Sequence, residues 1–378
     1  MSTDRGGVRL RRGVVVAVVA ARPGAVEIEV EVEGARAPAL AYPELTGPVG
    51  SGDRVLLNTT ATALGLGTAG FHLVVAVESD ASPDVALPGR VMKARYTPLQ
   101  LAVRSLEETH RDALEGSAGL QGLPVVCAPL HSMVALVAAG AKAAGAHRVV
   151  YVMTDGASLA GAFSRLVPRL RRAGLLDDFV TCGQAFGGDH EAATLWTGLL
   201  GAKEVLGADV VVVADGPGNL GTDTKWGVSA LGSGEALNAV EALGGRAVAA
   251  LRISFADHRR RHHGVSHHSL TILGEVCTVR ANVAVPALEG DALRGAVWTA
   301  LRSAKLEERH QLIEVDGRPA VAKLDELRFA VDSMGRAPLE DPVFFLAAGA
   351  AGVLAGRMAA GSRRHPQRSA SDGGSPFT

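Results

Sequence analysis

The first part of the chain alternates hydrophobic and polar residues with a period of two. Between residues 25 and 34, four aliphatic residues alternate with four glutamates, a pattern that predicts a strand with one buried and one solvated face. Further short apolar runs, separated by turns that contain Gly or Pro, lie at 13–21, 37–42, 54–58 and 71–77. Five short strands of this kind predict a small antiparallel β-barrel, of the OB or SH3-like type, over residues 8–78.

The pattern changes after residues 78–89, which are rich in Ser, Asp and Pro and predict a linker. Beyond them, continuous apolar runs alternate with stretches rich in Ala and Leu. The apolar runs lie at 123–130, 148–156, 178–184, 209–216 and 247–254, and the helical stretches at about 132–145, 158–174, 189–206 and 233–244. Apolar strands that alternate with helices predict a doubly wound, mostly parallel α/β sheet over residues 88–358.

The longest late apolar segment, residues 343–356, has fourteen residues before Arg357. A helix of this length is too short to cross a hydrocarbon core of about 30 Å, so we predict a buried helix. Residues 361–378 are polar and rich in Gly, Pro and Ser, which predicts a disordered tail. The charged N-terminus lacks the apolar segment of a secretory signal, and we expect no membrane association.

Composition and charge exclude several classes of partner. The formal net charge is −1 and aromatic residues make up 4% of the chain, so we expect no nucleic-acid partner. The three cysteines have no CxxC spacing and indicate neither a disulfide framework nor a thiolate zinc site. These features favour a cytoplasmic protein and leave the formation of a homo-oligomer open.

Polar residues and glycines follow each of the five predicted strands of the second domain. Ligands of open α/β sheets bind at the carboxyl ends of the strands, and right-handed crossovers bring these ends to one edge. The candidate catalytic residues in these loops are His131, Asp155, Asp189, Asp215, His267 and His268. The aspartates would be metal ligands or an acid/base pair, and the histidines would be ligands or proton carriers. Each residue also has a structural interpretation, because Asp and Ser cap helices and form turns.

Two of these loops are rich in glycine. The sequences FGGD at 186–189 and DGPGN at 215–219 bring backbone N–H groups close to a helix start, an arrangement that receives phosphate or carboxylate. The residues of this expected anion cradle are Gly187, Gly188, Gly216, Gly218, Asn219 and Thr222. Neither loop has GxGxxG or GxxxxGKS/T spacing, so a specific dinucleotide site or P-loop is not predicted.

The sequence RRRHHGVSHH, residues 259–268, allows three interpretations. His262 or His263, together with His267 or His268 and aspartates of neighbouring loops, would form a site for zinc, manganese or iron. The three arginines and the imidazoles would alternatively hold a phosphorylated or carboxylated substrate. The third interpretation is a solvated loop whose second histidine pair is partly buried. Between the two functional interpretations, we favour His267 and His268 pointing into the site, with the arginines nearer its mouth.

The sequence offers little for nucleophilic catalysis. Cys182 ends an apolar strand with no neighbouring cation in the sequence, which favours a buried structural thiol over a nucleophile. The GxSxG turn of a serine hydrolase is absent.

Several segments together resemble one protein family. They are residues 42–76, MKARYTPLQ at 92–100, TDGASL at 154–159, GQAFGGDHEA at 183–192, DGPGNLGT at 215–222 and GVSHH at 264–268. In combination they resemble an actinobacterial family catalogued as domain of unknown function 3866, with a similarity that would run to about residue 358. The family carries no assigned activity, so the resemblance implies a shared architecture without naming a reaction.

Three functions are compatible with these patterns. The first is a hydrolase or transferase that acts on a small anionic substrate, with an unknown cofactor or a divalent metal. The second is a non-catalytic sensor or scaffold that binds a nucleotide or metabolite in the same cleft and signals through the barrel. The third is a structural protein that binds a partner and whose polar loops hold no ligand.

Overall fold

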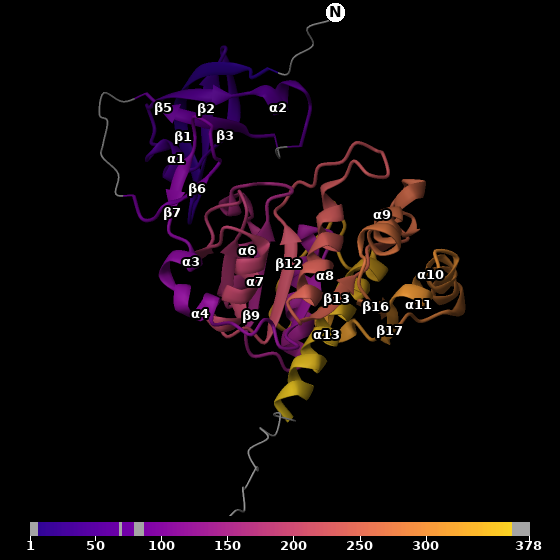
Figure 1. Cartoon of the computed structure of the whole chain (residues 1–378). Coiled ribbons are helices and arrows are strands. Elements are labelled where there is room, and N and C mark those ends of the chain that lie inside the picture. The colour runs from indigo at the N-terminus through magenta and orange to yellow at the C-terminus, as the bar shows by residue number, and fades with distance from the viewer. Residues whose placement is uncertain (1–6, 68–69, 79–86, 365–378) are drawn as a thin grey trace, which may run out of the picture.

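The first domain is a closed five-stranded barrel, drawn in indigo and violet in Figure 1. The computed structural model describes residues 7–67, 70–78 and 87–364. The barrel strands are β1 (Leu10–Arg22), β2 (Ala25–Val32), β3 (Ala35–Ala41), β4 (Arg54–Asn58) and β5 (His72–Val77), with the short helices α1 (Pro43–Thr46) and α2 (Thr60–Ala63) between them. The order is β1-β2-β3-β5-β4, and all neighbours are antiparallel except β3 and β5. The predicted barrel is confirmed, and its arrangement is of the OB type.

The alternating pattern of β2 fills the barrel interior with aliphatic side chains, among which Ile28 and Val30 are fully buried. The expectation of a solvated glutamate face is wrong at Glu27, which is also buried. Arg22 of the barrel donates to Glu27 over 2.5 Å, and Arg165 of the second domain donates to both of its carboxylate oxygens over 2.9 and 2.6 Å. This one carboxylate therefore joins the two domains.

The second domain is built on an eight-stranded parallel sheet. Its strands are β8 (Pro124–Cys127), β9 (Val149–Thr154), β10 (Asp178–Thr181), β11 (His190–Glu191), β12 (Val210–Asp215), β13 (Arg246–Ala250), β16 (Asn282–Pro286) and β17 (Gln311–Val315), in the order β11-β10-β9-β12-β8-β13-β16-β17. The central strands β8 and β12 are buried along their whole length, as their apolar runs require, and β12 ends in the buried Asp215. The parallel sheet is confirmed, and it extends beyond the five predicted strands by β11, β16 and β17, of which β11 lies at the start of the segment predicted as a helix.

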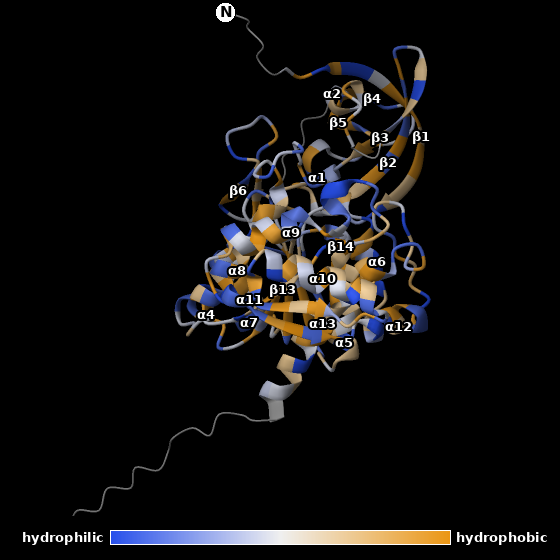
Figure 2. Ribbon diagram, turned by 90° about the vertical axis from the view of Figure 1, so that its right-hand side faces the viewer, coloured by the Kyte–Doolittle hydropathy of each residue, from blue (hydrophilic) through white to orange (hydrophobic). Residues whose placement is uncertain are grey.

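Helices cover both faces of this sheet, which makes it doubly wound. One face carries α5 (Val134–Ala143), α6 (Leu166–Arg172), α12 (Arg318–Glu326) and α13 (Pro342–Arg364). The other face carries α3 (Leu106–Thr109), α4 (Arg111–Glu115), α7 (Leu195–Glu204), α8 (Gly232–Ala242), α9 (His267–Thr271), α10 (Asp291–Ser303) and α11 (Leu306–Arg309). Figure 2 shows hydrophobic strands between helices that carry hydrophilic positions on their outer sides.

The winding direction reverses around β8. The chain leaves β8 for α5 on one face of the sheet, whereas it leaves the neighbouring strands β12 and β13 for α8 and α9 on the other face. Chain segments that diverge in this way leave a crevice beyond the carboxyl ends of the strands, and ligands of open α/β sheets bind there. In Figure 1 the barrel lies beyond the same edge of the sheet.

The helix α13 lies against α5 and the sheet. Its segment Pro342–Ser362 is long and apolar enough to cross a membrane, but 78% of the most apolar part is buried within the protein. The predicted buried helix is confirmed, and it continues through residues 361–364 of the predicted tail, whose remaining residues 365–378 lie outside the described part of the chain. Residues 79–86 of the predicted linker also lie outside it.

Glycines allow α13 and α5 to approach closely. A Cβ atom at Gly352 would overlap the carbonyl oxygen of Val137, and one at Gly140 would lie 2.6 Å from the carbonyl oxygen of Gly349. Neither contact is tolerated without a backbone shift, so the spacing of the two helices depends on these glycines.

We expect Gly352→Ala to lower the free energy of unfolding by about 1–3 kcal/mol, because the added methyl group overpacks a backbone contact. Gly361→Ala, in the same helix but with no atom near its Cβ position, is the control and should be neutral or stabilising by up to about 1 kcal/mol. Urea unfolding of both variants measures the difference. Equal effects of the two substitutions would contradict the packing argument.

Candidate functional site

A cavity of about 720 Å³ opens at the carboxyl ends of the central strands. It is lined by residues from the segments 129–132, 165–169, 217–223, 252–262 and 331–334, together with Val228, Ala230 and His268. Residues 129–132 follow β8, residues 217–223 follow β12 and residues 252–262 follow β13. The cavity therefore occupies the crevice where the winding reverses. Its volume is typical of sites for small molecules, which range over roughly 300–1,000 Å³.

The cavity lining carries more positive than negative charge. Five of the lining residues are positively charged, namely Arg165, Arg169, Arg252, Arg259 and Arg261. Two are negatively charged, namely Asp223 and Asp332. Arg261 forms an ion pair with Asp223 at the rim, where both side chains are partly exposed. The remaining arginines give the cavity a cationic wall.

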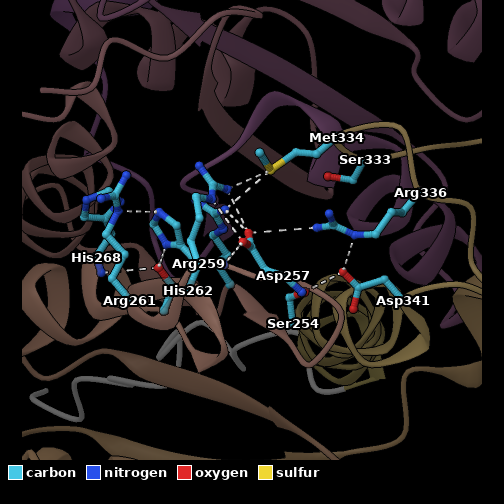
Figure 3. A network of polar contacts seen from close by, with 12 residues as sticks. Ser254, Asp257, Arg259, Arg261, His262, His268, Ser333, Met334, Arg336 and Asp341 are labelled. Atoms are coloured by element: carbon cyan, nitrogen blue, oxygen red, sulfur yellow. Dashed lines mark hydrogen bonds and ion pairs between the residues drawn. The ribbon is translucent and has the colours of Figure 1, made fainter. Parts of the chain in front are cut away.

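A network of guanidinium and carboxylate groups lies behind this wall (Figure 3). Arg259 donates to both oxygens of Asp257, over 3.0 and 2.7 Å, and Arg252 reaches the same carboxylate over 3.2 Å. Arg336 lies 4.0 Å from Asp257 and donates to Asp341 over 3.1 Å. Three guanidinium groups thus share two carboxylates.

Burial and neighbouring charges shift the pKa values of Arg252 and Asp257, but both groups stay ionised. Burial, together with the charge of the neighbouring Arg259, lowers the pKa of Arg252 to about 10. Hydrogen bonds from Arg259 outweigh the effect of burial at Asp257 and hold its pKa far below the usual range for a carboxyl group. Both groups are therefore charged at neutral pH, and an excess positive charge remains at the cavity wall.

Asp257, Arg259 and Arg261 come from a loop that is closed by a short antiparallel ladder between β14 (Ile253–Ser254) and β15 (Gly264–Val265), and Arg252 directly precedes β14. Ser266 follows the ladder and caps α9, because its hydroxyl oxygen accepts a hydrogen bond from the His268 N–H over 3.3 Å. The same hydroxyl lies 2.9 Å from Nδ1 of His262. After α9 the chain forms a π-helical turn (Ile272–Val276), a feature that is frequent at functional sites.

Three histidines form a cluster beside the arginines. His262, His267 and His268 each offer a ring nitrogen, and these atoms lie within 4.8 Å of one another. Nε2 of His267 is buried and has no hydrogen-bond partner in the described part of the chain. Burial and the nearby positive charges lower the pKa of all three, to about 3 for His262 and about 4 for His268. The cluster is therefore neutral at pH 7.

The cavity brings together five of the residues predicted from the sequence, namely His131, Gly218, Asn219, Thr222 and His268. His267 lies directly beside His268, with ring centroids 3.9 Å apart. Gly218 adopts a φ of 89°, which favours glycine, and Asn219 donates to the carbonyl oxygen of Pro129 over 2.9 Å. This bond joins the loops that follow β12 and β8.

Asp215 and Asp155 lie near the cavity but do not line it. Asp215 is buried, accepts hydrogen bonds from the Thr154 hydroxyl over 2.6 Å and the Gly156 N–H over 3.1 Å, and has a pKa that burial raises. Asp155 accepts a hydrogen bond from the Gln184 N–H over 2.7 Å. Both carboxylates hold neighbouring loops at the sheet edge.

The FGGD loop and Gly216 also lie outside the cavity lining. Asp189 forms an ion pair with Arg171 and accepts a hydrogen bond from the Phe179 N–H. The Gly187 N–H donates to Glu191 over 2.7 Å, the Gly188 N–H donates to Thr181 Oγ1 over 3.0 Å, and Gly216 packs closely against the Ser158 carbonyl. The two N–H groups of the FGGD loop are thus used within the protein.

His131 is buried at the cavity wall and both of its ring nitrogens are engaged. Nδ1 lies 3.1 Å from the Tyr151 hydroxyl and Nε2 lies 2.8 Å from Ser164 Oγ. Ser164 Oγ also accepts hydrogen bonds from the N–H groups of Leu166 and Val167, which makes it a cap of α6. This Ser–His pair therefore fixes the loop that carries Arg165.

Arg252, Asp257 and Arg165 were not among the site residues predicted from the sequence. Arg252 interrupts an apolar run at the carboxyl end of β13, and a buried charge in such a run is a signal for a paired or ligand-binding site. Arg165 carries no comparable local signal, because it reaches the cavity from α6 through the fold. Cys182 is buried, and burial raises the pKa of its thiol to about 12, which is consistent with a structural residue.

Residues 38–352 match the family described as "Protein of unknown function (DUF3866)". The chain belongs to this family. The match begins in β3, so it includes part of the barrel, and it continues through the sheet and the cavity into α13. It confirms the resemblance seen in the sequence motifs. No curated protein matches the chain.

We expect His131→Gln to reduce the pH dependence of stability. Burial lowers the pKa of His131 from 6.5 to about 4, so between these pH values the unfolded chain binds a proton that the folded protein does not. Stability is unaffected by this residue above pH 6.5 and falls as the pH drops toward about 4, by up to about 1.4 kcal/mol per pH unit.

Urea unfolding between these pH values measures how steeply the free energy of unfolding changes with pH in the wild type and in His131→Gln. His258→Gln, which removes an exposed imidazole, is the control. A slope in His131→Gln that equals the wild-type slope would show that His131 titrates normally.

Proposed function

We propose that the cavity binds a small phosphorylated or carboxylated molecule and that the protein is a cytoplasmic hydrolase or transferase acting on it. The observation that carries this proposal is the charge balance in and behind the cavity wall, where Arg252 and Arg259 of the lining and Arg336 behind it share the carboxylates of Asp257 and Asp341. We favour a small-molecule ligand over nucleic acid or a membrane, because the arginines are concentrated in one pocket of a chain whose net charge is −1.

A bound anion would remove an energetic cost that the protein otherwise bears. Burying a guanidinium group is costly unless a counter-charge and hydrogen bonds compensate for lost hydration. Arg252 is 7% exposed and shares its carboxylate partner with Arg259. Arginine matches the geometry of phosphate and carboxylate oxygens with paired N–H donors, so an anion between these side chains would supply the missing counter-charge.

The proton transfer that hydrolysis or transfer requires would fall to His268, with His267 behind it. His268 lines the cavity and is neutral at pH 7, so it has a lone pair free to accept a proton. The positive charges of Arg252, Arg261 and Arg259 contribute to lowering its pKa. An anion that neutralises these charges would bring the pKa back toward the range useful for an acid–base catalyst.

We expect phosphate, pyrophosphate or a di- or tricarboxylate to raise the melting temperature of the wild type, because a ligand that binds only the folded state stabilises it. Arg261→Gln should weaken the binding of the stabilising anion by about tenfold or more, because it removes a charged hydrogen-bond donor that is worth about 1.5–3 kcal/mol. Arg294→Gln breaks an exposed ion pair with Glu314, away from the cavity, and should leave binding unchanged.

Thermal shift and calorimetry measure these affinities, and a panel of phosphate esters and carboxylic esters tests turnover. Loss of turnover in His268→Asn with retained anion binding would support the enzyme. Anion affinity that Arg261→Gln and Arg294→Gln reduce equally would refute the assignment of the cavity.

A non-catalytic sensor is the second candidate, and the contact between the domains favours it. Arg165 lines the cavity while its guanidinium group holds Glu27 of the barrel. Burial opposes ionisation of Glu27, but the hydrogen bonds from Arg165 and Arg22 hold its pKa below the usual value. A ligand anion and this carboxylate would therefore compete for one guanidinium group, which would couple ligand binding to the position of the barrel.

If this coupling operates, Glu27→Gln should tighten anion binding by roughly fivefold or more, because the ligand no longer competes with a charged group. Glu31→Gln, at an exposed position on the same strand, is the control. Calorimetric titration of both variants decides the matter. An affinity that Glu27→Gln leaves at the wild-type value would argue against signalling through the barrel.

A further inference from the structure

The histidine cluster has the composition of a metal site rather than of a packed core. We infer that His262, His267 and His268 bind a divalent ion of the zinc type through one ring nitrogen each, with the fourth ligand position facing the cavity. Catalytic zinc sites have three protein ligands, often three histidines, and an open position for water or substrate. His262 and His268 line the cavity themselves, so an ion held between the three rings would be accessible from it.

The spacing of the rings is close to that of a bound site. The ring centroid of His262 lies 5.2 Å from that of His267 and 5.1 Å from that of His268. The candidate ligand atoms lie within 4.8 Å of one another, whereas the nitrogens around a tetrahedral zinc ion are about 3.3 Å apart for bonds of about 2.0–2.1 Å. Small rotations of the side chains would close this difference.

Nε2 of His267 gives independent support for a ligand. This atom is inaccessible to solvent and accepts or donates no hydrogen bond in the described part of the chain. A buried polar atom without a partner is costly, and such atoms in native proteins often mark an ion or water position. A metal ion would satisfy this nitrogen.

The surroundings orient the cluster for coordination. Arg261 donates to Nε2 of His262 over 3.3 Å, so the lone pair is on Nε2 and the proton is on Nδ1, which faces Ser266 Oγ at 2.9 Å. Metal-binding histidines commonly donate their second ring N–H to such a partner, which fixes the tautomer and the ring orientation. Binding of a metal to Nε2 would displace only Arg261, whose side chain is 35% exposed and pairs with Asp223.

Positive charge in the cavity wall opposes a cation and predicts how metal and anion interact. Arg252, Arg259 and Arg261 surround the cluster, and Asp257 and Asp223 offset only part of their charge. An anion bound between the arginines would lower the cost of binding the metal, and by linkage the metal would tighten anion binding by the same factor. A zinc ion bound here would occupy the lone pair of His268, so it would replace His268 as the activating group by polarising an oxygen of the bound anion. This role rests on the proposed function, whereas metal binding itself does not.

Zinc titration of the metal-free, full-length protein tests the site. The protein is stripped with a chelator, dialysed into a phosphate-free buffer and titrated with zinc in a calorimeter, with cobalt as a spectroscopic probe of tetrahedral geometry. We expect one zinc ion per chain in the wild type. His267→Gln and His268→Asn should each weaken binding by roughly 100-fold or more. His263→Gln should bind as the wild type does, because His263 is exposed and outside the cluster.

Circular dichroism and melting curves establish that each variant is folded. If either His267→Gln or His268→Asn does not fold, the other variant provides the test. Addition of phosphate should tighten zinc binding by roughly tenfold. Absence of stoichiometric zinc binding in the wild type, or equal loss in His263→Gln and the cluster variants, would overturn the inference. Anion binding by the metal-free protein is measured separately, so failure of the metal site and failure of the proposed function give different results.

Discussion

The reversal of winding around β8 is the constraint on which the rest of the structure depends. The helices that follow β8 and β9 cover one face of the sheet, whereas those that follow β12 and β13 cover the other. The loops that leave adjacent strands must therefore separate, and the space between them cannot be filled by a helix. The cavity, the loop that holds Asp257 and the histidine cluster all lie in or beside this gap. The site is thus a consequence of the strand order.

Electrostatics then gives the gap its chemical character. The sequence has almost no net charge, yet the fold concentrates guanidinium groups from the segment after β13 and from the N-terminal part of α6, with the residue before it, around one pocket. Glu27 of the barrel and Asp257 behind the cavity wall neutralise part of this charge, and an excess of positive charge faces the cavity. The same positive charge, together with burial, keeps the three histidines neutral and therefore able to accept a proton or bind a metal. Anion binding, proton transfer and metal binding are therefore linked.

The candidate site was only partly predictable. The rule that ligands bind at the carboxyl ends of strands grouped His131, Gly218, Asn219, Thr222 and His268, and these five residues line one cavity. The same rule grouped Asp155, Asp189 and the FGGD loop with them, although these residues bond to other groups at the sheet edge. Those loops follow β9 and β10, and although β9 borders the reversal, only Arg165, Leu166 and Arg169 line the cavity from the segment between these two strands. Sequence periodicity identifies a strand end but not which of the residues after it line the cavity.

The sequence by itself determined the elements: the alternating strands of the barrel, the unbroken apolar strands of the sheet and the buried α13. Those features depend on periodicity and burial, which a short window of residues contains. Only the tertiary structure decided that β12 enters between β9 and β8, that Glu27 of the barrel meets Arg165, and that His262 rather than His263 joins His267 and His268. These outcomes depend on contacts between distant or differently folded segments, and no local pattern of residues encodes which face or loop they share.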